Sequence, residues 1–150
     1  MKVLADTSVL VAAHLPAHTA FPVASSWLNR AKLGAFELVV SAHTLAETYS
    51  VLTRLPVNPK ITAQAAWQFI EQNILSCVKV IALAADDYRD LIGQAVQNGL
   101  VGGVIYDAVI AKGAELATVD YLLTLNVGHF QRVWPHGASR VVSPLAMTPP

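Results

Sequence analysis

The sequence predicts an α/β fold, a three-layer α/β/α sandwich with a five-stranded parallel sheet. The first observation behind this prediction is a set of short apolar runs with little polar alternation, which are typical of parallel strands covered on both faces. The second is that longer stretches with helical spacing separate these runs. Regular alternation of strands and helices favours parallel strands joined by right-handed crossovers.

The expected strands are the apolar runs Lys2–Ala5, Glu37–Val40, Val78–Leu83, Tyr121–Thr124 and Arg140–Val142. The first of these runs ends where Asp6 interrupts the apolar residues. The expected helices are Ser8–His14, Pro22–Leu33, Thr44–Leu55, Thr62–Leu75, Asp86–Asn98 and Val104–Leu116. Proline and glycine support these bounds, because Pro22 is tolerated in a first turn, while Pro56 and Gly99 end the helices before them.

The composition is typical of one globular domain, residues 1–150, with a tail from about residue 144 that we expect to be loosely ordered. Apolar residues make up 54% of the chain and charged residues 13%, against about 25% in an average soluble domain. This balance excludes an intrinsically disordered chain, and a net charge of zero excludes a strongly cationic surface. The low charge also favours exposed apolar surface, and with it self-association or a partner protein.

Cysteine content and hydropathy indicate the compartment. The single cysteine, Cys77, excludes a disulfide framework and a cysteine zinc cage, and it is typical of a reducing environment. No uncharged apolar stretch reaches the roughly 18 residues that a membrane span requires. Asp6 also interrupts the first apolar run too early for a signal peptide. We therefore expect a cytoplasmic protein without a membrane segment.

Four polar residues that are far apart in the chain are expected at one edge of the sheet. Asp6 and Asn126 directly follow the first and fourth strands, and ligands of parallel sheets bind beyond these carboxyl ends. Glu47 lies near the start of the helix that leaves the second strand. Asp107 lies near the start of the helix that leads into the fourth strand. The predicted topology thus brings three carboxylates and one amide together.

These carboxylates require a compensating charge. Two unit charges about 4 Å apart repel by about 4 kcal/mol at an effective dielectric constant of about 20. Cations are scarce nearby, since Arg54 is two turns from Glu47 and Lys112 lies on a different helix face from Asp107. A hard divalent cation is the best remaining compensation, because Mg²⁺ prefers carboxylate oxygens together with several waters. Such an ion can activate water and stabilise charge on a phosphate.

The residues around these positions form four short motifs in order along the chain. They are Asp6-Thr7-Ser8-Val9-Leu10, Ala46-Glu47-Thr48, Tyr106-Asp107-Ala108-Val109-Ile110-Ala111, and Asp120-Tyr121-Leu122-Leu123-Thr124-Leu125-Asn126 followed by His129-Phe130. Taken together, from Lys2 to about Pro144, they resemble the PIN domain family. The size of the chain is similar to that of VapC-type toxins of bacterial toxin–antitoxin pairs.

The resemblance implies a Mg²⁺- or Mn²⁺-dependent endoribonuclease that hydrolyses RNA phosphodiester bonds. It also implies a homodimer and a small antitoxin protein as partner. The implied metal-site carboxylates are Asp6, Glu47 and Asp107. Asn126 would be the fourth catalytic position, where Asp is commoner in the family. The implied supporting hydroxyls are Thr7, Ser8 and Thr124.

Simpler roles remain open for these residues. Asp6 could only cap the helix that follows it, Thr44 and Glu47 form a capping-box pattern, and Asp107 could act only through the helix dipole. Two other functions also remain open. One is an aspartate-based phosphatase or phosphotransfer domain, although Ser8 stands where such enzymes usually carry a second Asp. The other is a catalytically weak PIN-like protein-binding module.

Overall fold

The structure, a computed structural model, describes all 150 residues and contains one five-stranded parallel sheet. The strands are β1 (Lys2–Ala5), β2 (Glu37–Ser41), β3 (Val78–Ile81), β4 (Tyr121–Leu123) and β5 (Val141–Val142). Their order across the sheet is β3-β2-β1-β4-β5, and every neighbouring pair is parallel. The predicted fold class is therefore confirmed, with β1 in the centre.

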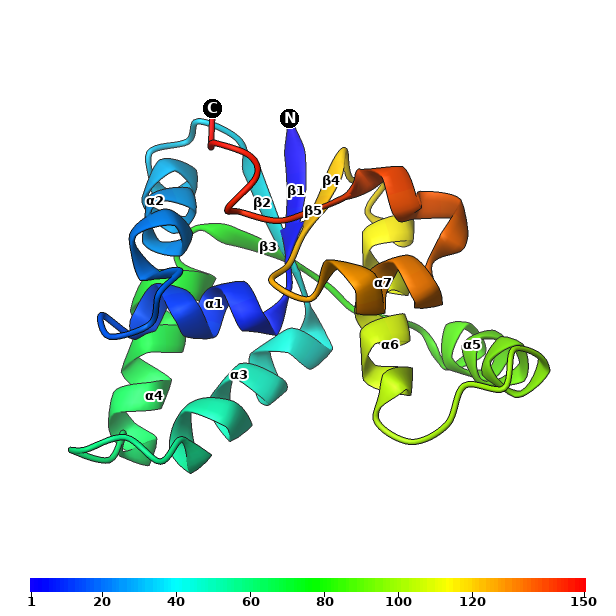
Figure 1. Ribbon diagram of the computed structural model, residues 1–150, viewed down its shortest axis with the longest axis horizontal. Coiled ribbons are helices and arrows are strands. Elements are labelled where there is room, and N and C mark those ends of the chain that lie inside the picture. Colours follow the sequence, from blue (N-terminus) through cyan, green and yellow to red (C-terminus); the bar gives the residue numbers. More distant parts are fainter.

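Helices cover both faces of this sheet (Figure 1). The helices are α1 (Thr7–His14), α2 (Phe21–Lys32), α3 (Ala42–Arg54), α4 (Ala63–Phe69), α5 (Ala85–Gln97), α6 (Val104–Leu116) and α7 (Val127–Val133). A π-helical segment, Ile70–Leu75, continues α4. In Figure 1, α1 to α4 lie on one side of the sheet and α5 to α7 on the other.

The strands alternate their side chains between two hydrophobic cores. In β1, Val3 belongs to the core under α1 and α2, whereas Leu4 belongs to the core under α6 and α7. This alternation follows from the period of two residues in a strand. Trp27 and Phe130 are the largest fully buried side chains of the two cores. Burial of such a side chain contributes about 1.5–3 kcal/mol, so both faces hold the sheet in place.

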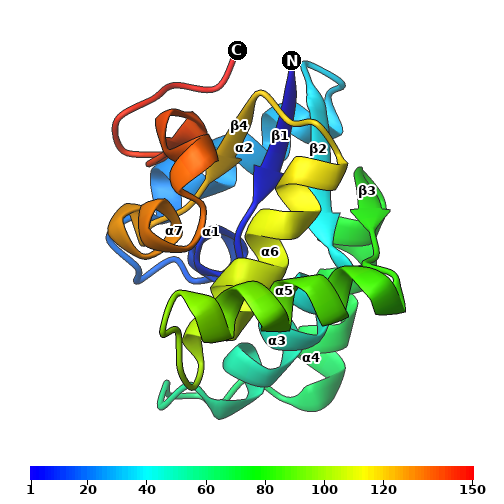
Figure 2. The same ribbon diagram turned by 90° about the vertical axis from the view of Figure 1, so that its right-hand side faces the viewer.

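Helix α6 lies close against the sheet because Gly113 leaves room for it. A Cβ atom at Gly113 would lie 3.3 Å from Cγ2 of Ile81 on β3. Helix α5 packs on the outside of α6 and crosses its first turns (Figure 2). No helix of the protein combines the length and the apolar character that crossing a membrane requires.

Two elements differ from the sequence-based expectation. Helix α7 is not among the helices expected from the sequence, although Val127, Phe130 and Val133 have the spacing of a buried helix face. Strand β3 ends at Ile81 and is an edge strand with half-exposed residues, so the expectation of full cover on both faces is wrong for this strand. At the end of the chain, Met147 packs against the core, and Arg30 donates from Nε to the carbonyl of Pro150 at 2.6 Å.

Candidate active site

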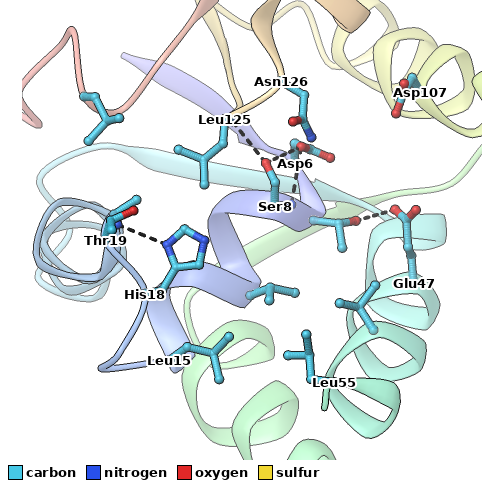
Figure 3. A pocket seen from close by; sticks show the side chains of 15 residues that line it. Asp6, Ser8, Leu15, His18, Thr19, Glu47, Leu55, Asp107, Leu125 and Asn126 are labelled. Atoms are coloured by element: carbon cyan, nitrogen blue, oxygen red, sulfur yellow. Dashed lines mark hydrogen bonds between the residues drawn. The ribbon is translucent and has the colours of Figure 1, made fainter. Parts of the chain in front are cut away.

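A cleft of about 590 Å³ lies beyond the carboxyl ends of the strands (Figure 3). One end of the cleft is polar and contains the residues that the topology was expected to bring together: Asp6, Glu47, Asp107 and Asn126. The other end is apolar and is formed mainly by α1, α3 and the residue Leu145 of the C-terminal tail. Figure 3 shows Leu15 and Leu55 at this apolar end, away from Asp6 and Asn126.

Asp6 is the most buried acid of the cleft. It follows β1 and caps α1, because its Oδ2 accepts hydrogen bonds from the backbone N–H of Ser8 at 3.3 Å and from Ser8 Oγ at 2.6 Å. The same oxygen accepts a third bond, from Thr124 Oγ1 at 2.8 Å. Burial raises the pKa of Asp6 above its ordinary value, and the three hydrogen bonds oppose this shift. Asp6 thus both caps α1 and lines the cleft.

The hydroxyl groups around Asp6 connect two segments of the chain. Thr124 Oγ1 accepts a bond from the backbone N–H of Asn126 at 2.9 Å, and Ser8 Oγ accepts one from the N–H of Leu125 at 3.0 Å. Ser8 and Thr124 therefore hold the loop after β4 against the start of α1. This loop places Asn126 beside Asp6 at the polar end of the cleft (Figure 3).

Glu47 faces the cleft from the second turn of α3. Ser41 caps this helix, with Oγ accepting from the N–H of His43 at 3.2 Å, so the alternative role of Thr44 and Glu47 as a capping box is excluded. The physical reason is that α3 begins directly at the end of β2, before Thr44. Thr7 Oγ1 instead donates a hydrogen bond to Oε2 of Glu47, which connects α1 with α3.

Asp107 lies in the first turn of α6, across the cleft from Glu47 (Figure 3). Its Oδ2 is 3.6 Å from Nδ1 of His129, a largely exposed residue of α7. Burial raises the pKa of Asp107, and the charges of Asp6 and Glu47 raise it further, while His129 opposes the shift. The pairing of His129 with Asp107 is not predicted from the sequence, because helix α7 is not among the expected helices.

The donor set fits a hard cation that keeps part of its water. No three acidic, histidine or cysteine side chains lie close enough to hold an ion on their own. The acids are nevertheless near enough to raise one another's pKa, and no Lys or Arg lines the cleft to neutralise them. Mg²⁺ is commonly bound by one or two carboxylates and several waters, so Asp6, Asp107 and Glu47 suit this ion better than a zinc ion with a closed shell.

The fold and the cleft define an α/β/α protein with an acidic cleft at the carboxyl edge of its parallel sheet. Comparison with known families identifies the class more closely: the family model of the PIN domain matches residues 3–133. The chain belongs to the PIN domain family.

Two relatives agree with this placement, and a solved structure has a similar fold. Ribonuclease VapC40 of Mycobacterium tuberculosis is 36% identical over 120 residues, which cover 77% of this chain and 84% of the relative. Ribonuclease VapC27 of the same organism is 33% identical over 121 residues, covering 77% of this chain and 82% of the relative. The crystal structure of FitAcB from Neisseria gonorrhoeae has a TM-score of 0.66 at 22% identity and covers 97% of this chain and 99% of that one.

Proposed function

We propose that this protein is a Mg²⁺- or Mn²⁺-dependent endoribonuclease that hydrolyses RNA phosphodiester bonds, and that it is the toxin of a type II toxin–antitoxin pair. The observation that carries the proposal is the buried carboxylate of Asp6, which shares a cleft with Glu47 and Asp107 while no Lys or Arg lines that cleft. Membership of the PIN domain family and the 36% identity to a protein named as a ribonuclease support the same activity.

Each residue of the polar end has a proposed task. Asp6 and Asp107 would hold the cation most directly, and Glu47 would complete or orient its shell. When bound, the ion would supply a lowered water pKa and compensation for negative charge on a phosphate. Ser8 and Thr124 keep the Asp6 carboxylate in one orientation, and Thr7 does so for Glu47. Asn126 presents an uncharged amide beside Asp6, which keeps the negative charge of the cleft lower than a fourth carboxylate would.

The proposed partners follow from the apolar surfaces. The apolar end of the cleft, around Leu15, Val51 and Leu55, would accept apolar side chains of an antitoxin. For the homodimer, α5 exposes an apolar stripe on one helix face, Tyr88, Ile92 and Val96. Light scattering on the purified protein would measure the oligomeric state, and a monomer at all concentrations would contradict the dimer. We also propose that the protein acts in the cytoplasm, where it would meet its RNA substrate.

The test is cleavage of single-stranded RNA by rigorously purified protein. We expect cleavage with Mg²⁺ or Mn²⁺, none with excess chelator, and recovery when the ion is returned. Asp107→Asn should remove the activity while circular dichroism and thermal unfolding remain those of a folded protein. Ion-independent cleavage, or equal cleavage by Asp107→Asn, would reject the proposal. A folded wild-type protein that neither cleaves RNA nor binds divalent ions would instead support a protein-binding module.

A further inference from the structure

An aromatic pair between α3 and α6 has no part in the proposed chemistry. The rings of His43, on α3, and Tyr106, on α6, are stacked with centroids 5.0 Å apart and planes 15° from parallel. Tyr106 is nevertheless 50% exposed. His43 packs against one side of the tyrosine ring, and the exposed half of the residue is open to a second flat group.

The pair is held in place by the fold. The backbone N–H of His43 donates to the Ser41 cap, which fixes the first turn of α3 at the end of β2. The ring atom Nε2 of His43 is buried and has no hydrogen-bond partner, so packing against Tyr106 is the contact that orients the ring. A tyrosine that is already ordered loses less rotamer freedom on binding, and this loss is one of the main costs of association.

The pair also lies beside both acids of the cleft that come from helices. Tyr106 directly precedes Asp107, so their Cα atoms are about 3.8 Å apart. His43 and Glu47 are four residues apart on α3 and therefore lie on the same side of that helix, one turn from each other. The two rings therefore belong to residues within one helical turn of Asp107 and Glu47, the carboxylates that we propose for catalysis.

No Lys or Arg lines the cleft to contact the RNA phosphates, so RNA affinity needs a source besides the cation. Stacking of bases on aromatic side chains supplies affinity for single-stranded nucleic acids and tolerates any base, since every base has an aromatic face. An exposed ring with a second ring behind it, next to an acidic cleft, has the chemistry that such a base requires.

We propose that Tyr106, supported from behind by His43, is a stacking platform for one unpaired base of the RNA, next to the phosphodiester bond that is cleaved. The inference rests on the proposed ribonuclease function and adds to it the group that positions the substrate. In this arrangement Asp107 would hold the cation at the reacting phosphate, and Tyr106 would hold a neighbouring base.

The first arm of the test measures binding without cleavage. All proteins carry Asp6→Asn, and the probe is a fluorescent single-stranded RNA oligonucleotide that the wild type cleaves, followed by anisotropy in buffer with Mg²⁺. Tyr106→Leu should weaken binding by roughly 5- to 150-fold, the range for one stacked base. Tyr106→Phe keeps the ring and should bind like the parent. The matched control is Tyr49→Leu, because Tyr49 is 40% exposed but lies on a different side of α3 from Glu47; its binding should be unchanged.

The second arm keeps the tyrosine and changes the RNA. Abasic sites are placed one at a time on both sides of the cleaved bond. One abasic position should weaken binding of the parent as much as Tyr106→Leu does, and with that RNA the parent and Tyr106→Leu should bind equally. This arm remains informative if Tyr106→Leu is found by thermal unfolding to be misfolded.

The outcomes separate the two proposals. If the wild type cleaves RNA but Tyr106→Leu binds like Tyr49→Leu, or no abasic position removes the difference between Tyr106→Leu and its parent, the platform is wrong and the ribonuclease remains. A Tyr106→Leu protein that changes only its oligomeric state by light scattering would also overturn the platform, in favour of a protein contact. If the wild type cleaves no RNA with either ion, the proposed function fails and the platform fails with it.

Discussion

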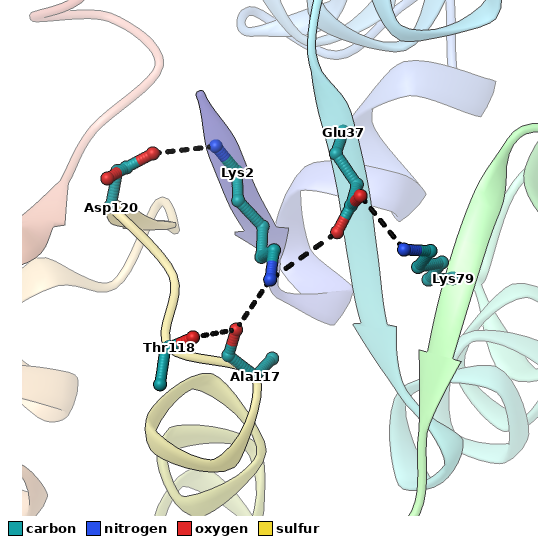
Figure 4. A network of polar contacts seen from close by, with 6 residues as sticks. All are labelled: Lys2, Glu37, Lys79, Ala117, Thr118 and Asp120. Atoms are coloured by element: carbon teal, nitrogen blue, oxygen red, sulfur yellow. Dashed lines mark hydrogen bonds and ion pairs between the residues drawn. The ribbon is translucent and has the colours of Figure 1, made fainter.

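Acidic side chains lie at both ends of the strands of the parallel sheet, but their surroundings differ. We call the amino ends of the strands the amino edge and the carboxyl ends the carboxyl edge. At the amino edge, the carboxylate of Glu37 lies between two lysines (Figure 4). Lys79 Nζ is 3.0 Å from Oε2, and Lys2 Nζ is 3.6 Å from Oε1. The backbone N–H of Lys2 also donates to Oδ2 of Asp120 at 2.7 Å. The charges at this edge are compensated within the protein.

At the carboxyl edge the acids lack such compensation. Hydroxyl and backbone groups are the hydrogen-bond donors to Asp6, and the exposed ring of His129 is the one possible cation beside Asp107. The pKa shifts at the two edges have opposite directions. Lys79 lowers the pKa of Glu37, whereas burial raises the pKa values of Asp6 and Asp107. Acids compensated by neighbours stabilise a fold, while buried uncompensated acids are typical of sites that bind or react.

The largest expected effect comes from exchanging one acid at each edge. Asp6→Asn should lower RNA cleavage by more than about 100-fold, since even groups that only orient metal ligands are worth about 10- to 100-fold. Glu37→Gln should leave cleavage unchanged. The Asn variant should remain folded, because Asn caps helices as well as Asp does. Initial rates on one RNA measure the difference, and equal losses in the two variants would remove the functional distinction between the edges.

Divalent ions should stabilise the protein through the carboxyl edge. At 100 times the dissociation constant, a ligand of the folded state adds about 2.7 kcal/mol, or about 5–10 °C in the melting temperature of a domain of this size. Scanning calorimetry with Mg²⁺ or Mn²⁺ measures the shift, which should be lost in Asp6→Asn and kept in Glu37→Gln. A shift that persists in Asp6→Asn would place the ion elsewhere.

Without divalent ions, the melting temperature of the protein should depend on pH. A carboxyl whose pKa is higher in the folded state binds protons more tightly there, so the folded protein loses stability as pH rises. For Asp6 this loss should begin near the ordinary value of 3.8 and end above the raised folded-state pKa. Asp6→Asn should therefore flatten the curve of melting temperature against pH. A wild-type curve that rises through this window, with no change in the variant, would contradict the raised pKa.

A smaller effect is expected from Thr124→Val, which keeps the shape of a fully buried side chain but removes the hydroxyl that donates to Asp6. Loss of such an orienting group should lower cleavage by about 10- to 100-fold. The pKa of Asp6 should rise further, because one of the hydrogen bonds that lower it is gone. The pH–rate profile should then move its acidic limb to higher pH. A slower variant with an unmoved profile would indicate general damage to packing.

The smallest effect is expected at the amino edge. Glu37→Gln should lower the melting temperature slightly at neutral pH, because exposed ion pairs contribute little. The pKa of Glu37 is lowered, so the pair stabilises the protein above the ordinary value of 4.5 and loses this contribution as pH falls through the folded-state pKa. The difference between variant and wild type should accordingly disappear in acid. A difference that is constant with pH would exclude the ion pair as its cause.

The two edges also differ in how far they could be predicted. Local periodicity and the rule for parallel connections sufficed to place Asp6, Glu47 and Asp107 on one edge. The lysine pairs of Glu37 had no sequence signal, because they join three separate strands through their register. The start of α3 was misplaced for a related reason, since Thr44 resembles a cap while Ser41, at the end of β2, is the residue that the fold uses.

By itself, the sequence determined the alternation of strands and helices and which acids leave the same edge of the sheet. Both follow from spacing along the chain and from connectivity. Only the tertiary structure decided that Thr124 bonds to Asp6 across 118 positions, that His129 faces Asp107, and that a second ring supports Tyr106. The physical reason is that burial, hydrogen bonding and ring stacking act between atoms a few ångströms apart, whatever the distance between their residues in the chain.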